Sequence, residues 1–146
     1  MRKLLIVIAS AAALASCGIA HHRMFGKTSL DPKKVEVDVV QGTTQAYIVV
    51  SQDPLVFVGD QGEVDIRWKL QNPNYDFDNT GISITARPIT GTKNPISGCQ
   101  GNGSDESSCK NNTNDKATVK YTITVKPKPG SGLRTPKPYD PMIVND

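Results

Sequence analysis

The sequence predicts an all-β protein folded as a sandwich of two packed sheets. Two segments, residues 63–70 and 117–126, alternate strictly between apolar and polar side chains, as a strand does when one face is buried and the other faces water. The 146 residues include 12 glycines and 10 prolines, and this turn-rich composition suits short strands better than a helical bundle. No segment beyond residue 16 carries the apolar stripe of a helix.

The segment 63–70 is expected to form the centre of the core. Trp68 is the only tryptophan of the chain, and a two-layer β-structure would bury its large apolar ring. The apolar side of this segment consists of Val64, Ile66, Trp68 and Leu70. We therefore expect the other strands to be arranged around this one.

Further short strands are expected on both sides of this segment. Alternating patterns and short apolar runs place them at residues 34–39, 45–51, 55–58 and 82–86. Two polar stretches are expected to connect strands without regular structure of their own, namely a loop at 72–81 and an irregular segment at 87–108.

The composition changes after Lys126. Five prolines, together with Gly130 and Gly132, punctuate residues 127–146, which predicts an extended and flexible Pro-rich tail. The apolar residues 142–144 offer an alternative, in which the end of the chain docks onto a sheet edge or adds a strand to a partner.

The first residues have the layout of a secretory signal peptide. Two basic residues, Arg2 and Lys3, precede a short apolar run that ends in small residues. The run is too short for a permanent transmembrane helix, which needs about 20 residues. Residues 1–16 are therefore expected to be removed.

Leu14-Ala15-Ser16-Cys17 resembles the lipobox of bacterial lipoproteins. In that family the signal is cut before the cysteine, which becomes the lipid-modified first residue. The resemblance implies that Cys17 anchors the chain to membrane lipid, and several acyl chains hold a protein stably at a bilayer. Gly18 in the next position is similar to the Gram-negative sorting pattern for the outer membrane, which implies a body that faces the periplasm.

The length allows one ordinary domain. The expected organisation is a signal peptide at 1–16, a lipid-anchored tether at 17–32, the sandwich at 33–126 and the Pro-rich tail at 127–146.

The three cysteines support an address outside the cytoplasm. If Cys17 carries lipid, Cys99 and Cys109 remain as the only candidate disulfide pair, and an oxidising compartment permits that bond. The alternative is a metal site, but further ligands are lacking near the two cysteines.

The strand pattern resembles an immunoglobulin-like sandwich, with about six short strands and a tryptophan in an early-middle strand. Residues 115–121 are similar to the region of such domains that precedes a late strand and ends in tyrosine. Cys99 and Cys109 are expected in a loop rather than on facing strands. The resemblance therefore implies a single immunoglobulin-like antiparallel β-sandwich, not membership of the antibody-type family.

Copper binding is one chemical alternative. If cleavage followed Ala20 instead, His21 would be the N-terminal residue, and this arrangement resembles copper monooxygenases and copper carriers. The only other histidine is the adjacent His22, so the fold has no second imidazole to bring to the metal. A looser copper site made by His21, His22 and Met24 is the alternative to solvated tether side chains.

Calcium binding is a second alternative. Residues 76–81 begin like an EF-hand loop, but Arg87 stands at the twelfth position, where that motif requires glutamate. The EF-hand is therefore rejected. A simpler calcium site made by Asp76, Asp78 and Asn79 is weighed against a solvated turn.

Enzymatic chemistry and nucleic-acid binding have no support in the sequence. The expected sandwich contains no histidine and no G-x-S-x-G motif, so a nucleophile–base arrangement is not predicted, and neither is a cofactor. The formal net charge of +3 is too small to predict nucleic-acid binding.

The function expected from these observations is that of a lipid-anchored cell-envelope binding or adaptor module with a protein partner. Its binding surface is expected to combine a loop at 75–79 with the loop between Cys99 and Cys109, because long loops on a rigid scaffold commonly carry recognition. Tyr75 and Phe77 would be aromatic anchors, with Asp76 and Asp78 beside them. A periplasmic copper-handling protein and a structural envelope component are the alternative functions.

Overall fold

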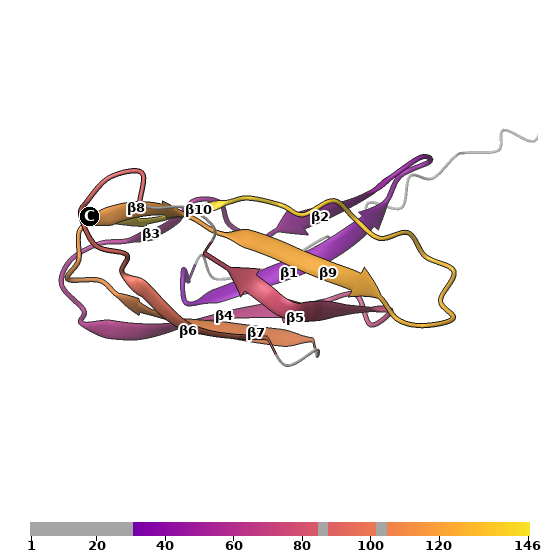
Figure 1. Ribbon diagram of the computed structural model, residues 1–146, viewed down its shortest axis with the longest axis horizontal. Helices are drawn as coiled ribbons and strands as arrows, with labels where there is room; N and C mark the ends of the chain where they lie inside the picture. Colours follow the sequence, from indigo (N-terminus) through magenta and orange to yellow (C-terminus); the bar gives the residue numbers. More distant parts are fainter. Residues whose placement is uncertain (1–30, 85–87, 102–104) are drawn as a thin grey trace, which may run out of the picture.

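The computed structural model describes residues 31–84, 88–101 and 105–146. These ranges contain ten strands and no helix (Figure 1), which confirms the all-β prediction. The strands are β1 (Lys34–Gln41), β2 (Ala46–Val50), β3 (Leu55–Phe57), β4 (Glu63–Leu70), β5 (Tyr75–Ser83), β6 (Ile96–Gly101), β7 (Glu106–Asn112), β8 (Ala117–Lys120), β9 (Thr122–Pro127) and β10 (Met142–Asn145).

The N-terminal predictions concern other residues. The signal peptide, Cys17 and the candidate copper ligands His21, His22 and Met24 lie outside the described residues. Within the described ranges, no helix has the length and apolarity needed to cross a membrane.

The strands form one large sheet and two small ones, packed as a sandwich. The large sheet has the order β2-β1-β4-β7-β6, and the small sheets have the orders β3-β10-β8 and β5-β9. Most neighbouring strands are antiparallel, but β1 pairs with β4 and β3 pairs with β10 in parallel. The two larger sheets are therefore mixed rather than wholly antiparallel. Each parallel pair joins strands that do not follow each other in the sequence, as expected, because a parallel pair needs a longer connection than a hairpin.

The core is centred on β4, as its alternating pattern predicts. Ile66, Trp68 and Leu70 are buried, while the charged residues between them face outward. The indole Nε1 of Trp68 donates a hydrogen bond to the buried Tyr121 Oη at 3.3 Å, and the two ring centroids lie 5.3 Å apart. Burial raises the pKa of Tyr121, so the phenol stays protonated as a core residue.

The second alternating segment is divided between two sheets. Its inward residues are all buried, as predicted, and they are Ala117, Val119, Tyr121, Ile123 and Val125. The part before Tyr121 forms β8 and pairs with β10, whereas the part after it forms β9 and pairs with β5. One amphipathic strand thus carries the core from one small sheet into the other.

The expectation of an irregular segment at 87–108 is wrong. It contains β6 and the start of β7, and β7 pairs with β4 along seven residues. The alternation of β7 was hidden because its buried residues Ser107, Cys109 and Asn111 are small or polar rather than apolar. Buried polar groups need partners, and Ser107 Oγ finds one by donating to the carbonyl of Gln100 at 2.8 Å.

The predicted loop at 72–81 is mostly strand β5. It pairs antiparallel with β9, and the register shifts between Phe77 and Ile82. The turn before it is limited to the Asn72–Pro73–Asn74 region, where the amide of Tyr75 donates to the carbonyl of Asn72 at 3.2 Å.

The prediction of a flexible C-terminal tail is also wrong. β10 lies between β3 and β8 in the three-stranded sheet (Figure 1), and Ile143 is fully buried. Residues 142–144 therefore dock onto the sheet, as the alternative prediction had it. Insertion between two strands pairs the backbone groups of β10 and removes its apolar side chains from water.

Candidate functional site

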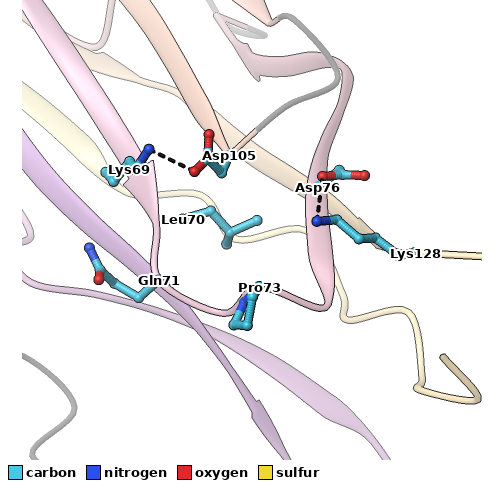
Figure 2. Close-up of a pocket in the computed structure, with 7 residues that line it drawn as sticks. All are labelled: Lys69, Leu70, Gln71, Pro73, Asp76, Asp105 and Lys128. Carbon is cyan, nitrogen blue, oxygen red and sulfur yellow. Dashed lines mark hydrogen bonds and ion pairs between the residues drawn. The ribbon is translucent and has the colours of Figure 1, made fainter.

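The described surface has a groove where β4 and β5 meet, which we call the strand-end groove (Figure 2). Its volume is about 640 Å³. Its lining residues come from four separate parts of the chain, and they are Lys69, Leu70, Gln71, Pro73, Asp76, Asp105 and Lys128. Only a folded sandwich brings these segments together.

Local structure explains how the groove is formed. The alternation of β4 turns Leu70 into the core and Lys69 outward. The side-chain Oδ1 of Asn72 then accepts a hydrogen bond from the backbone amide of Asn74 at 3.1 Å. This local bond favours a tight turn. This turn brings Asp76 on β5 back beside the end of β4.

Two pairs of opposite charge face each other across the groove, with Leu70 between them (Figure 2). Lys69 Nζ lies 2.7 Å from Asp105 Oδ2, and Lys128 Nζ lies 3.6 Å from Asp76 Oδ1. The hydrogen bond between Lys69 and Asp105 raises the pKa of the lysine and lowers the pKa of the aspartate. Both members of that pair therefore stay ionised over a wide pH range.

The Lys69–Asp105 pair is open to solvent, and the Lys128–Asp76 pair is less so. The side chains of Lys69 and Asp105 are 50% and 53% exposed, so water screens their attraction and the pair adds little to stability. Such pairs can reorganise around the charges of a partner at small cost. The groove is therefore better suited to recognition, in which complementary charge gives specificity, than to holding the fold together.

The two predicted aromatic anchors are buried, so that part of the prediction is wrong. Tyr75 and Phe77 point inward from β5 and are 0% exposed. Tyr75 Oη donates to the carbonyl of Arg134 at 2.7 Å and accepts a hydrogen bond from Gln41 Nε2, while burial raises its pKa. The apolar–polar alternation of residues 75–78 was the signal that could have identified a strand here.

The two acidic residues of that segment face outward and are paired. Asp76 lies at 3.6 Å from Lys128, and Asp78 Oδ1 lies at 3.4 Å from Lys126 Nζ. The backbone amide of Asn79 and then Lys126 lower the pKa of Asp78. Among the described residues, no three His, Cys, Asp or Glu side chains gather in a way that could hold a metal ion.

The disulfide pairing predicted from the cysteine count is confirmed. Cys99 and Cys109 are bonded, with their Cα atoms 4.1 Å apart. They lie on the paired strands β6 and β7 rather than in a loop, at the point where the register of that pair shifts. The bond fastens the edge strand β6 beside β7, whose first residues follow the groove residue Asp105.

The two segments predicted to form one binding surface do meet. Asp76 from the first segment and Asp105 from the second line the same groove. The backbones are close as well, because a Cβ on Gly101 would lie 3.2 Å from the carbonyl oxygens of Asp78 and Asn79. What sequence reasoning missed is Lys69, Gln71 and Lys128, which look like any solvated surface residues until the fold assembles them.

Removing the disulfide tests its structural role. The bond closes a separation of 10 residues, so Cys99→Ser/Cys109→Ser is expected to lower the free energy of unfolding by about 2–3 kcal/mol through greater freedom of the unfolded chain. Urea unfolding followed by Trp68 fluorescence measures the change. A difference under about 0.5 kcal/mol, the scatter of ordinary surface substitutions, would contradict the expectation.

The sequence matches no protein-family model, and no curated protein is significantly similar to it.

Proposed function

We propose that this chain is a lipid-anchored module of the cell envelope that binds a protein partner through the strand-end groove. The observation that carries the proposal is the arrangement of two opposite-charge pairs on either side of Leu70. A partner segment that presents charges of both signs would complement this surface. The proposed role is recognition rather than catalysis, because the only histidines of the sequence are His21 and His22.

The proposed location rests on the N-terminal sequence. The lipobox-like residues 14–17 support anchoring through Cys17, and the outer membrane facing the periplasm is the proposed address. The Cys99–Cys109 disulfide supports an oxidising compartment. In this arrangement the lipid holds the sandwich near the bilayer, and the groove remains available to an envelope protein.

Charge reversal in the groove tests the proposed binding. Lys69→Glu/Lys128→Glu leaves two carboxylates in each pair, so we expect partner recovery from detergent-solubilised envelope to fall by about tenfold, equivalent to about 1.4 kcal/mol. Quantitative affinity capture with the tagged chain measures the recovery. The matched control is Lys116→Glu, because Lys116 pairs with Asp60 at 3.5 Å and is about as exposed as the groove lysines. Asp60 lies before the start of β4, whereas the groove lies at the end of that strand.

A swapped pair separates recognition from structure. Asp76→Lys/Lys128→Glu keeps an ion pair in the same place but reverses its direction. If the partner recognises the signs of the charges, the recovery of the partner by this variant is as low as with the charge-reversal variant. If the ion pair only supports the fold, the recovery equals that of the unmodified chain. Unchanged recovery in both groove variants would contradict the groove assignment.

A further inference from the structure

The last residues of the chain form an arm that fills a gap in the body. We define the C-terminal arm as residues 134–146 and the body as residues 31–127 in so far as they are described. The arm strand β10 pairs in parallel with β3 and antiparallel with β8, and β3 and β8 are not paired with each other. Figure 1 shows the three strands side by side. The body therefore offers a slot for one extended strand.

The arm is held by bonds to the body alone. Tyr139 exchanges backbone hydrogen bonds with Ile123 at 2.8 and 3.1 Å. Tyr139 Oη and the amide of Met142 donate to the two carboxylate oxygens of Asp53 at 2.8 and 3.0 Å. Arg134 Nη1 donates to two carbonyls in the β1–β2 turn. No hydrogen bond joins one residue of the described arm to another, so none of these contacts depends on which chain supplies the arm.

The slot also selects one side chain by its chemistry. The amides of Asn145 and Asn111 donate to each other's oxygens, both at 2.9 Å, and both side chains are buried. Asn145 Nδ2 further lies 3.2 Å from the carbonyls of Asn112 and Asp115. Ile143 fills the apolar part of the slot two residues earlier. The slot thus recognises an apolar residue and an asparagine at strand spacing.

The covalent link between body and arm contacts the body at both ends, where the amide of Lys128 donates to the carbonyl of Asn74 at 2.8 Å and Leu133 packs against the core. The middle of the link makes few contacts. It contains Pro129-Gly130-Ser131-Gly132, and a Cβ on either glycine would have no atom within 4 Å. Both glycines have positive φ, 77° and 65°, which glycine adopts at little cost. The segment holds a turn through the bond from the Ser131 amide to the Lys128 carbonyl at 3.2 Å. This turn at Gly130 and Gly132 is the hinge about which the arm would be redirected.

We propose that the slot between β3 and β8 is a strand-binding site that takes the C-terminal arm of a second copy, so that two chains exchange arms. The arm–body contacts are the same within one chain and between two. The free energies of the exchanged and unexchanged forms therefore differ only through the hinge and through the entropy of association. A short flexible linker gives the chain's own arm an effective concentration on the order of millimolar. Dilute chains therefore keep their own arms, whereas chains that fold at high local concentration exchange them.

Cysteine trapping in the full chain tests the exchange. Val56 and Val144 are facing partners in the β3–β10 pair, and neither side chain is fully buried. The Val56→Cys/Val144→Cys chain is unfolded, freed of reductant and refolded at roughly 10 µM and roughly 1 mM, which lie below and near the effective concentration set by the linker. It is then oxidised with glutathione disulfide. Mixed heavy- and light-isotope chains distinguish links within one chain from links between chains by peptide mass.

We expect links from position 56 of one chain to position 144 of another, with a dimer fraction at least about fivefold higher at the higher concentration. Deleting residues 130–132 shortens the hinge and should make the dimer the main product. The single variants Val56→Cys and Val144→Cys are the controls for casual surface contacts. Links confined to one chain at both concentrations with the intact hinge would overturn the proposal, whether or not the deletion variant folds.

Discussion

Trp68→Ala is expected to lower the free energy of unfolding by about 3–5 kcal/mol, the usual range for removing a buried tryptophan ring. The side chain is 0% exposed at the centre of β4, and its loss leaves a cavity that the surrounding strands cannot fill. It also leaves Tyr121 Oη without the bond from Trp68 Nε1. Urea unfolding followed by far-ultraviolet circular dichroism measures the change, since this variant has no tryptophan to report by fluorescence.

Trp68→Phe separates the ring from the hydrogen bond. Phenylalanine keeps much of the apolar volume but removes the donor to Tyr121, so we expect a smaller loss than with alanine. Trp68→Phe/Tyr121→Phe should recover part of that loss, because removing both partners leaves no unsatisfied buried hydroxyl. A loss under about 1 kcal/mol for Trp68→Ala would mean that this strand is not the centre of the core.

Asn145→Ala is expected to lower the free energy of unfolding by about 2–4 kcal/mol, because it leaves the buried amide of Asn111 without its partner. The same substitution weakens the attachment of β10, the strand that completes the β3-β10-β8 sheet. Thermal and urea unfolding of the purified chain measure the loss. Val144→Thr is the control on the same strand, since this side chain is only partly buried and takes no part in the amide pair.

A double-mutant cycle identifies the amide pair as the cause. If Asn111 and Asn145 act through each other, Asn111→Ala/Asn145→Ala costs less than the sum of the two single substitutions. Strictly additive losses would show that the two amides stabilise the fold independently, contrary to their reciprocal bonds.

The sequence predicted those parts of the fold in which apolar periodicity is strong. The alternation of β4 and of residues 117–126 identified the buried faces that the structure shows. β7 was missed because Ser107 and Asn111 occupy its buried positions, and polar residues at inward positions carry no hydrophobic period. Their burial depends on partners, such as Asn145, that lie far away in the sequence.

The candidate site was predictable only in part. Asp76 and the stretch between the two cysteines were singled out, and the groove contains Asp76 and Asp105. The sequence assigned Tyr75 and Phe77 to a loop because Pro73 and the asparagines and glycine around them indicate turns, yet both rings belong to the core. Lys69 and Lys128 are brought to the groove by long-range strand pairing, which single-sequence patterns do not encode.

The most direct test of the account is the intact mass of the mature N-terminus in chain purified from the envelope. We expect the first residue to be Cys17, with a mass that exceeds that of residues 17–146 by the attached acyl chains, because residues 14–17 resemble a lipobox. A chain that begins at His21, or that retains an unmodified Cys17, would contradict the proposal of a lipid-anchored binding module.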